Sequence, residues 1–416
     1  MEVHSWFETS PPVLPKPGSL TSSRTSSSGS ITIPDRMQYS SAIYEETSFS
    51  SLQSDVSQDS SHNSHQKMIN SPSVTHSCTG NFQTLTPQIS FLAVHGNTLY
   101  AASLNEINVF DLTNYCLVDN LNCSGMAKSI AFVENKIFTS HQDCKIRVWQ
   151  IASSSKKHQL ISTLPTVKDR LRRCVLPKNY VQVRRHKQKL WIEHADTISG
   201  LAVNDGLIYS VSWDKSFKIW RISDLSCLES VKAHSDAINA IVVCANGLIY
   251  TASSDGTIKI WQRNDDGRKK HKLVTTLDKH KAGINALAIN EDGSVLFSGG
   301  FDENILVWEK DNTADDHMVL SHSLKGHTGA ILCLTIVDDF LISGSSDRTV
   351  RIWKRSREYG YCCIRVLEGH LKPIKTLVAI SGRNGDGTVI SIFSGSLDGQ
   401  IKVWKVTTNS TSCTSP

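Results

Sequence analysis

A fourteen-residue pattern that recurs along the chain constrains its fold more than any other feature. The clearest copy runs from Leu248 to Trp261 and reads LIYTASSDGTIKIW, two short β-branched runs joined by Ser-Ser-Asp-Gly. Asp-Gly between alternating apolar residues is a strong signal for a β-hairpin. Related stretches end at Trp220, Trp308, Trp353, Trp404 and, in a more divergent copy, Trp149. Such self-similarity predicts a chain built from repeated supersecondary units.

Polar residues keep a fixed spacing within these copies. Each copy has an aspartate six residues before its tryptophan and a serine or threonine four residues before the aspartate. The aspartates are Asp143, Asp214, Asp255, Asp302, Asp347 and Asp398, and the hydroxyl residues are Thr139, Ser210, Thr251, Ser298, Ser343 and Ser394. Five copies also carry an upstream histidine in a loop, namely His194, His234, His280, His327 and His370.

A period in the forties, with four short strands and a His, an Asp and a Trp per unit, is typical of a propeller blade. In this pattern the chain resembles the WD-repeat (WD40) family from about Asn81 to Val406. The resemblance implies an all-β fold, a seven-bladed WD-repeat β-propeller, with a structural hydrogen-bond relay in each complete blade. In that relay the aspartate holds the histidine, the histidine holds the hydroxyl, and the hydroxyl holds the indole N–H. The five relays would be His194, Ser210, Asp214 and Trp220; His234, Thr251, Asp255 and Trp261; His280, Ser298, Asp302 and Trp308; His327, Ser343, Asp347 and Trp353; and His370, Ser394, Asp398 and Trp404.

Ser, His and Asp also form the nucleophilic triad of many hydrolases. Here the set is repeated five times, whereas an enzyme has one active site. The chain contains no glycine-rich phosphate loop, and its eleven cysteines show neither C-x-x-C nor a Cys/His zinc spacing. We therefore expect a protein that is not an enzyme, with no catalytic residues, no cofactor and no metal.

The remaining blades must close a ring. Blade one, from about Gln88 to Leu121, has Leu104 and Phe110 at the Asp and Trp positions, and blade two, ending near Leu164, has Cys123 at the His position. Residues 81–406, less a 26-residue insertion at 165–190, give about 43 residues for each of seven blades. Only a polar stub, 407–416, follows the last hairpin. We therefore predict that the N-terminal strand NFQTL, at 81–85, completes the last blade and removes two open sheet edges.

Residues 1–80 differ in composition from the rest. They contain 22 serines and few large apolar residues, so they cannot bury enough surface to offset the entropy of ordering, and we predict a disordered tail. The run 25–30 and Ser71 are candidate phosphorylation sites, although a solvated tail without a regulated site fits equally well. The scattered cysteines and the lack of a signal peptide or a long apolar run predict a reduced, soluble protein without a membrane span, in the cytoplasm and/or the nucleus.

The insertion at 165–190 reads PTVKDRLRRCVLPKNYVQVRRHKQKL and carries nine Lys or Arg against one acid, Asp169, a net charge of +8. It joins the last strand of blade two to the first strand of blade three, which predicts that it lies on the face of the Asp turns. A basic segment attracts acidic or phosphorylated peptides and nucleic-acid phosphates. The candidate contacts are Arg172, Arg173, Arg184, Arg185 and Lys187. The alternative is a solvated loop that packs Leu171, Val175, Leu176, Tyr180 and Trp191 against the rim.

The residue before each turn aspartate projects from the same face in the WD-repeat family, which uses this upper face to bind partners. Here these residues are Gln142, Trp213, Ser254, Phe301, Ser346 and Leu397. An exposed Trp or Phe is a natural anchor for a protein partner. We therefore expect Trp213, Phe301 and Leu397 to contribute to partner binding, unless the basic insertion covers them.

The insertion, with KDRLRR, LPKNYVQVRRHK and then LWIEHAD, behind a Ser-rich tail, is similar to the plant JINGUBANG group. This resemblance implies a regulatory role, the restraint of pollen germination through protein partners such as transcription factors. We therefore expect a monomeric, non-enzymatic scaffold that binds an acidic or phosphorylated protein through the upper face and the insertion. Two alternatives stay open: a phosphate-directed binder of RNA, DNA or anionic lipid, and a ubiquitin-ligase substrate receptor. The WD-x-Arg ending associated with such receptors is absent after every blade tryptophan, which counts against the second.

Overall fold

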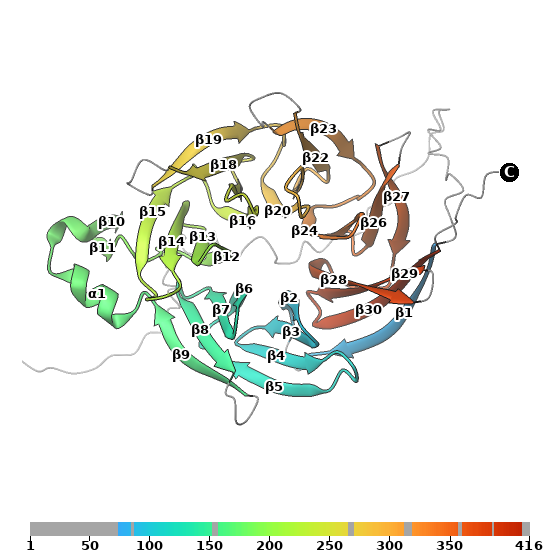
Figure 1. Ribbon diagram of the computed structural model, residues 1–416, viewed down its shortest axis with the longest axis horizontal. Coiled ribbons are helices and arrows are strands. Elements are labelled where there is room, and N and C mark those ends of the chain that lie inside the picture. The colour runs from blue at the N-terminus through green and yellow to red at the C-terminus, as the bar shows by residue number, and fades with distance from the viewer. Residues whose placement is uncertain are drawn as a thin grey trace, which may run out of the picture. The chain divides into compact units, whose positions relative to one another are not determined.

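Seven four-stranded antiparallel sheets form a ring (Figure 1). The computed structural model describes residues 74–84, 87–151, 157–264, 270–311, 318–356, 360–384 and 387–409. The predicted all-β, seven-bladed propeller is confirmed. The candidate phosphorylation sites and the tail up to residue 73 lie outside the described residues.

Each blade runs from an inner strand to an outer strand. Blade 1 consists of β2 (Ile89–His95), β3 (Thr98–Ser103), β4 (Glu106–Asp111) and β5 (Leu117–Asn122), and blade 2 of β6 (Ala127–Val133), β7 (Lys136–His141), β8 (Ile146–Ile151) and β9 (His158–Leu164). Blade 3 consists of β12 (Ile198–Asn204), β13 (Leu207–Ser212), β14 (Ser216–Arg221) and β15 (Cys227–Lys232), and blade 4 of β16 (Ile238–Val243), β17 (Ile249–Ser253), β18 (Ile258–Arg263) and β19 (His271–Leu277). Blade 5 consists of β20 (Ile284–Ile289), β21 (Val295–Gly300), β22 (Ile305–Lys310) and β23 (Met318–Leu324), and blade 6 of β24 (Ile331–Val337), β25 (Phe340–Ser345), β26 (Val350–Ser356) and β27 (Gly360–Leu367). Blade 7 consists of β28 (Ile374–Asn384), β29 (Gly387–Ser396), β30 (Gln400–Asn409) and β1 (Val74–Gln83).

The hydrophobic core lies between neighbouring blades. Phe217 and Ile219 of blade 3, for example, pack with Ile249 and Trp261 of blade 4. The second strand of a blade has neighbours on both faces, which is why the strand LIYSVS of blade 3 is buried along its whole length. Contacts between inner strands run around the ring, and β2 touches both β6 and β28.

The ring closes through the N-terminal strand, as predicted. β1 pairs antiparallel with β30, with Phe82 opposite Ile401. The strand begins at Val74, so the prediction that residues 74–80 belong to the tail was wrong. Thr75 to Thr79 of β1 are mostly polar and form the exposed outer edge of blade 7, so this part of the sequence lacks an apolar strand signal. At the other end β30 extends to Asn409, three residues into the expected polar stub.

The insertion is folded. It forms helix α1 (Val167–Cys174), the 3-10 helix η1 (Pro177–Asn179), and a hairpin of β10 (Tyr180–Arg184) and β11 (Lys187–Leu190). The Thr166 side chain accepts a hydrogen bond from the backbone N–H of Asp169 at 3.1 Å and caps the helix.

The placement of the insertion corrects the prediction. Its two ends meet the propeller on the face of the Asp turns, but its body lies outside the ring, beside the outer strands β9 and β15 (Figure 1). Helix α1 contacts Cys227, the first residue of β15. Because antiparallel strands alternate in direction, Cys227 lies at the end of β15 that is remote from the Asp turns. The insertion therefore extends the outer rim of the ring.

Candidate functional site

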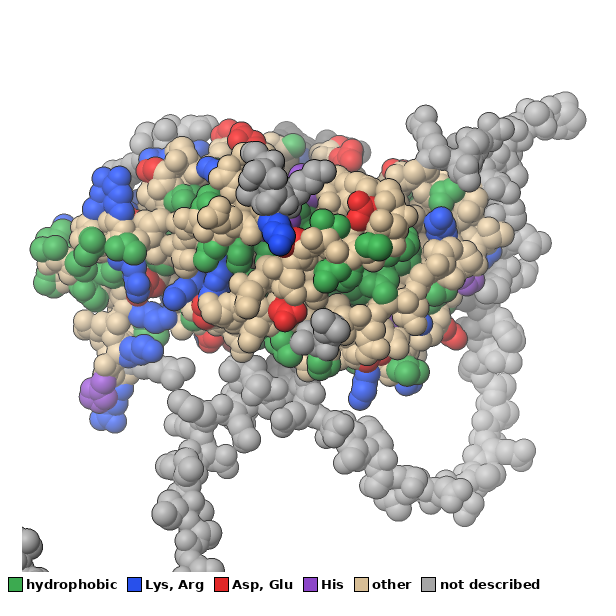
Figure 2. Space-filling view, turned by 90° about the horizontal axis from the view of Figure 1, so that it is seen from below, with side chains coloured by type: hydrophobic (Ala, Val, Ile, Leu, Met, Phe, Trp, Pro, Cys, Tyr) green, Lys and Arg blue, Asp and Glu red, His purple; other side chains and the backbone are tan. Residues whose placement is uncertain are grey.

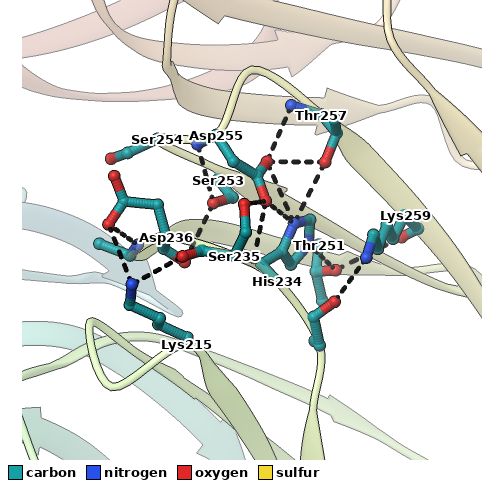
Figure 3. A network of polar contacts seen from close by, with 12 residues as sticks. Lys215, His234, Ser235, Asp236, Thr251, Ser253, Ser254, Asp255, Thr257 and Lys259 are labelled. Atoms are coloured by element: carbon teal, nitrogen blue, oxygen red, sulfur yellow. Dashed lines mark hydrogen bonds and ion pairs between the residues drawn. The ribbon is translucent and has the colours of Figure 1, made fainter.

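The turns between second and third strands and the loops before inner strands share one face of the ring, which we call the upper face. Figure 3 shows His234, Thr251 and Asp255 of the blade 4 relay on this face. The imidazole of His234 donates from Nδ1 to the Asp255 carboxylate at 3.0 Å and accepts at Nε2 from the Thr251 hydroxyl at 2.8 Å. The same hydroxyl oxygen accepts the indole N–H of Trp261 at 3.0 Å. The four side chains thus tie a loop, a turn and two strands together.

Blades 3, 5 and 6 have the same relay. The distance from His Nδ1 to the carboxylate is 2.8, 2.9 and 2.6 Å in these blades, in that order. The distance from His Nε2 to the hydroxyl is 2.8, 2.7 and 2.7 Å. The indole N–H donates to the same hydroxyl at 2.9, 2.8 and 2.9 Å. The sets are His194, Ser210, Asp214 and Trp220; His280, Ser298, Asp302 and Trp308; and His327, Ser343, Asp347 and Trp353.

The electrostatics of the relay suit a structural role. Burial lowers the pKa of His194, His234 and His280, so these imidazoles are neutral near pH 7. Burial alone would raise the pKa of Asp255, but hydrogen bonds from Thr257 and the neighbouring His234 bring it to about 2. The carboxylate is therefore ionised and already occupied by donors from its own blade. The Thr251 hydroxyl is fully buried between its partners, so it cannot reach a substrate.

Blade 7 has an incomplete relay. His370 Nε2 lies 2.6 Å from the Ser394 hydroxyl, which accepts the indole N–H of Trp404 at 2.8 Å. The expected bond to Asp398 is missing, because His370 Nδ1 and Asp398 Oδ2 are buried without a hydrogen-bond partner. This expected relay is therefore wrong in its His–Asp step.

Blade 2 replaces the missing loop histidine in a way that the sequence reasoning did not anticipate. His141 Nε2 lies 2.7 Å from the Thr139 hydroxyl, and Trp149 donates to that hydroxyl at 2.8 Å. Asp143 pairs instead with Arg147 at 2.7 Å. A signal for this exchange was present, because the other complete repeats have Ser or Gly at the position of His141.

The turns of the upper face are held in one common way. The backbone N–H of the residue before each turn aspartate donates a hydrogen bond to a backbone carbonyl of the same blade. That carbonyl belongs to the residue immediately before the inner strand. The bonds are Gln142 to Met126 at 2.9 Å, Trp213 to Thr197 at 3.0 Å, Ser254 to Ala237 at 2.8 Å, Phe301 to Gly283 at 2.9 Å, Ser346 to Ala330 at 2.9 Å and Leu397 to Pro373 at 3.1 Å. The side chains at these six positions therefore start from equivalent points on the upper face.

Among the predicted anchors, Phe301 is the most accessible. It is 40% exposed, whereas Trp213 and Leu397 are half-buried. The Lys128 ammonium of blade 2 lies 5.7 Å from the centroid of the Trp213 ring. Burial, and to a lesser degree the charge of Lys375, lowers the pKa of Lys128 to about 8. A cation of the neighbouring blade therefore flanks Trp213. The insertion was the expected cover for these residues, and its body lies on the outer rim of the ring.

The basic residues of the insertion divide into two groups. Arg173 holds the helix in place: its Nε lies 2.8 Å from Asp169, its Nη2 donates to the Cys227 carbonyl at 3.0 Å, and its guanidinium lies 4.5 Å from the Trp191 ring centroid. These contacts give Arg173 a structural role, and its use as a partner contact stays a prediction. Arg172, Arg185 and Lys187 are exposed, and the side chain of Arg184 lies outside the described part of the structure.

The alternative prediction, that apolar residues of the insertion pack against the rim, is wrong for most of them. Leu171, Val175, Leu176 and Tyr180 are exposed, and only Trp191 is half-buried, under Arg173. The physical reason is that Asp169 and Arg173, one helical turn apart, face the propeller. Leu171 and Val175 therefore point to the other side of α1.

The described part of the chain lacks two further features. No three or more His, Cys, Asp or Glu side chains there are grouped so that they could hold a metal ion. None of the helices in this part of the chain has the length and apolar character needed to span a membrane.

The fold and the repeated His–hydroxyl–Trp bonds define a β-propeller built from WD-type repeats. Residues 225–262, 271–309, 318–354 and 361–405 match the WD40 family, described as WD domain, G-beta repeat. Each match starts around the outer strand of one blade and ends near the third strand of the next. The chain therefore contains WD40 repeats, and they fall in the part of the ring that follows the basic insertion.

Three known proteins are similar to parts of the chain. Zinc finger CCCH domain-containing protein 59 of Arabidopsis thaliana is 27% identical over 165 residues, 38% of this chain and 32% of its own length. WD repeat-containing protein pop2 of Schizosaccharomyces pombe is 26% identical over 169 residues, 33% of this chain and 22% of its own. DENN domain and WD repeat-containing protein SCD1 of Arabidopsis thaliana is 31% identical over 132 residues, 32% of this chain and 10% of its own. The chain spans about a third or less of the length of each relative.

Proposed function

We propose that this protein is a non-enzymatic scaffold that binds a protein partner through the upper face of its propeller. One observation carries the proposal: large apolar side chains, above all Phe301 and Trp213, project from turns that the relays and backbone bonds fix. An anchor presented on a fixed loop loses little conformational entropy on binding. Aromatic side chains in such positions are typical hot spots of protein interfaces.

The charge near Trp213 favours an acidic or phosphorylated partner. Lys128 lies beside the indole ring, and the nearby Lys375 contributes to its lowered pKa. A carboxylate or phosphate brought to this place would offset the repulsion between the two ammonium groups. An acidic partner is therefore expected to bind more tightly than a neutral one at low salt.

A non-enzymatic role agrees with the state of the polar groups. The relay hydroxyls are fully buried, and each accepts an indole N–H. A triad serine must instead expose its oxygen to the substrate.

The experiment that tests the proposal is affinity purification from nuclease-treated extract. The double variant Trp213→Ala with Phe301→Ala is expected to lose the partner that the intact protein recovers. Ser254→Ala with Ser346→Ala is the matched control, because these residues occupy equivalent turns of blades 4 and 6 and have small side chains. A thermal transition within about 2 °C of the intact protein checks that the variants are folded.

Two outcomes would contradict the proposal. Retention of the partner by the Trp213/Phe301 variant would show that the upper face is not the binding surface. Loss of all recovered material on nuclease treatment would make nucleic acid the ligand.

The resemblance of the insertion to the plant JINGUBANG group supports a narrower form of the proposal. In that form the scaffold restrains pollen germination by binding a transcription factor, or another acidic or phosphorylated protein, in the cytoplasm or nucleus. Pollen that lacks the protein would then germinate too readily, and the Trp213/Phe301 variant would fail to restore restraint. Full restoration by that variant would refute the link between this face and that role.

A further inference from the structure

A second surface, on the outer rim, has the chemistry of a docking site. Helix α1 presents Val167, Leu171 and Val175 to solvent, and we call these three residues the apolar stripe. We propose that the apolar stripe, with the cations around it, binds an acidic amphipathic helix of a partner protein. This site is separate from the upper face.

The helix is held to the propeller by polar groups only on its opposite side. Asp169 is 4% exposed and accepts the backbone N–H of Cys227 at 3.0 Å. Arg173 donates to the carbonyl of the same Cys227 at 3.0 Å. Both backbone groups of one residue in the outer strand β15 are therefore bound by side chains one helical turn apart, which fixes the rotation of α1 about its axis.

Further bonds hold the two ends of the insertion. Arg170 pairs with Glu193, and Lys189 donates to the His194 carbonyl at 2.9 Å. Asn179 donates to the Arg173 carbonyl at the end of α1 at 2.8 Å. Leu190, at the end of the hairpin, is buried in the core between blades 2 and 3. The stripe is thus carried by an ordered support.

The apolar stripe follows the helical repeat. Val167, Leu171 and Val175 are spaced by four residues and are 72%, 64% and 77% exposed. Leu176, the residue after Val175, and Val181 of β10 are also exposed. Figure 2 shows hydrophobic side chains gathered at the left end of the molecule, where Figure 1 places α1, with Lys and Arg side chains above and below them. A group of apolar residues that a folded support holds out to water marks an interaction site.

Charge complementarity selects the occupant. The exposed cations of the insertion are Lys168, Arg170, Arg172, Lys178, Arg185 and Lys187, and Arg170 among them pairs with Glu193. The only acid of residues 165–190, Asp169, is buried against the propeller. A partner must therefore supply apolar side chains for the stripe and carboxylates for its margins. An amphipathic helix with apolar residues at i, i+3, i+4 and i+7 and Asp or Glu beside them meets both demands.

Other occupants fit less well. A phosphate backbone matches the cations but offers nothing to cover Leu171 and Val175. Helices that bind membrane surfaces are often 20–30 residues long, and stable attachment takes more than one signal. α1 has eight residues, about 12 Å of helix. A protein helix of two or three turns is the better match.

The test uses fluorescence anisotropy with the full-length protein and a designed 18-residue helical peptide. The peptide has Leu at i, i+3, i+4 and i+7 and Glu beside these positions; one control peptide scrambles this sequence and another replaces Glu by Lys. We expect the intact protein to bind the acidic peptide at least about tenfold more tightly than either control. Leu171→Glu with Val175→Glu should weaken that binding at least about tenfold.

Matched variants separate this proposal from the one for the upper face. Val319→Glu changes an exposed valine of the outer strand β23 and should leave peptide binding unchanged. Trp213→Ala with Phe301→Ala should also bind the peptide normally, even if it loses a partner of the upper face. Equal binding of acidic and scrambled peptides, or full binding by the Leu171/Val175 variant, would overturn the inference.

Two further measurements identify a wrong occupant. Sedimentation with vesicles containing 30% anionic lipid would overturn the inference if the intact protein bound and the Leu171/Val175 variant did not. Sedimentation velocity would overturn it if the intact protein formed dimers that the same variant lost, because a second copy would then cover the stripe. Absence of both effects, with peptide binding that depends on the stripe, is the expected result.

Discussion

Asp347 and Asp398 occupy the same position in blades 6 and 7 but have very different surroundings. Asp347 accepts the Nδ1 hydrogen of His327 at 2.6 Å, the backbone N–H of Thr349 at 2.9 Å and the Thr349 hydroxyl at 2.8 Å. Asp398 accepts the backbone N–H of Gln400 at 2.9 Å, and its other oxygen has no hydrogen-bond partner. The same substitution in the two blades therefore measures what the complete relay contributes.

Replacing Asp347 by Ala removes the close acceptor of the buried His327 N–H, at 2.6 Å, and leaves it only the Thr349 hydroxyl, 3.3 Å away. A buried donor without a partner costs about 1–3 kcal/mol, and each lost turn bond adds about 0.5–1.5 kcal/mol. We therefore expect Asp347→Ala to lower the free energy of unfolding by about 2–4 kcal/mol. Asp398→Ala removes one turn bond from a carboxylate that already lacks its histidine, so we expect a loss of about 0.5–1.5 kcal/mol.

These free energies convert into melting temperatures. With an unfolding entropy of about 2.1 cal/mol/K per residue over roughly 340 residues, 1 kcal/mol lowers Tm by about 1.4 °C. Asp347→Ala should then lower Tm by roughly 3–6 °C and Asp398→Ala by roughly 1–2 °C. Differential scanning calorimetry at pH 7.5 and one scan rate resolves this difference. The exposed Asp278→Ala serves as control and should shift Tm by less than about 1 °C.

Equal losses from Asp347→Ala and Asp398→Ala would refute this reasoning. The histidine step would then contribute nothing measurable, and the relay would matter only through the hydroxyl and the tryptophan. A larger loss from Asp398→Ala would refute it more strongly, because the blade with the fewest bonds would depend most on its aspartate.

Three further predictions concern acid, ring closure and the insertion. Burial lowers the pKa of His370 to about 4, below about 6.5 in the unfolded chain, so the unfolded chain binds more protons in this range and stability falls from pH 6.5 toward 4. His370→Gln should flatten this part of the Tm–pH curve, and an unchanged slope would contradict the assignment. Deleting residues 74–84 removes the strand that covers β30 and should lower Tm by roughly 10 °C or more, whereas an unchanged Tm would contradict the closure of the ring. Asp169→Ala should speed tryptic cleavage after Arg172 or Lys178 while the Tm of the propeller shifts by less than about 3 °C, and an unchanged cleavage rate would show that this carboxylate does not hold α1.

The fold could be predicted because its signals are local. A blade is built around a hairpin, and the constant six-residue spacing between aspartate and tryptophan marks that hairpin in each copy. The need for a closing strand followed from the missing partner after Trp404. The length of β1 did not follow, because Thr75 to Thr79 are mostly polar residues that form the exposed edge of the sheet.

The errors arose where side chains change partners. In blade 2 His141 replaces a histidine that the pattern places 18 or more residues away, and Asp143 turns to Arg147. A search by aligned position cannot find a substitute that enters from another strand. In the insertion, the count of charges treated the guanidinium of Arg173 as unpaired. Asp169 lies four residues earlier on the same helix, and this spacing indicates an ion pair.

Helix α1 of the insertion has its polar and apolar faces reversed relative to an ordinary surface helix. This reversal is the strongest physical reason to assign α1 a binding function. Surface helices generally bury an apolar face and expose a polar one. Here Asp169 and Arg173 face the propeller, while Leu171 and Val175 face water. An eight-residue helix has little stability by itself, so its order depends on the cap, on these two side chains and on the buried Leu190. A connection that only joined two blades would gain more by burying Leu171 than by holding it in solvent, because each buried leucine contributes roughly 1.5–3 kcal/mol. The arrangement becomes favourable once a partner covers the stripe, and binding then recovers the burial that folding leaves unused.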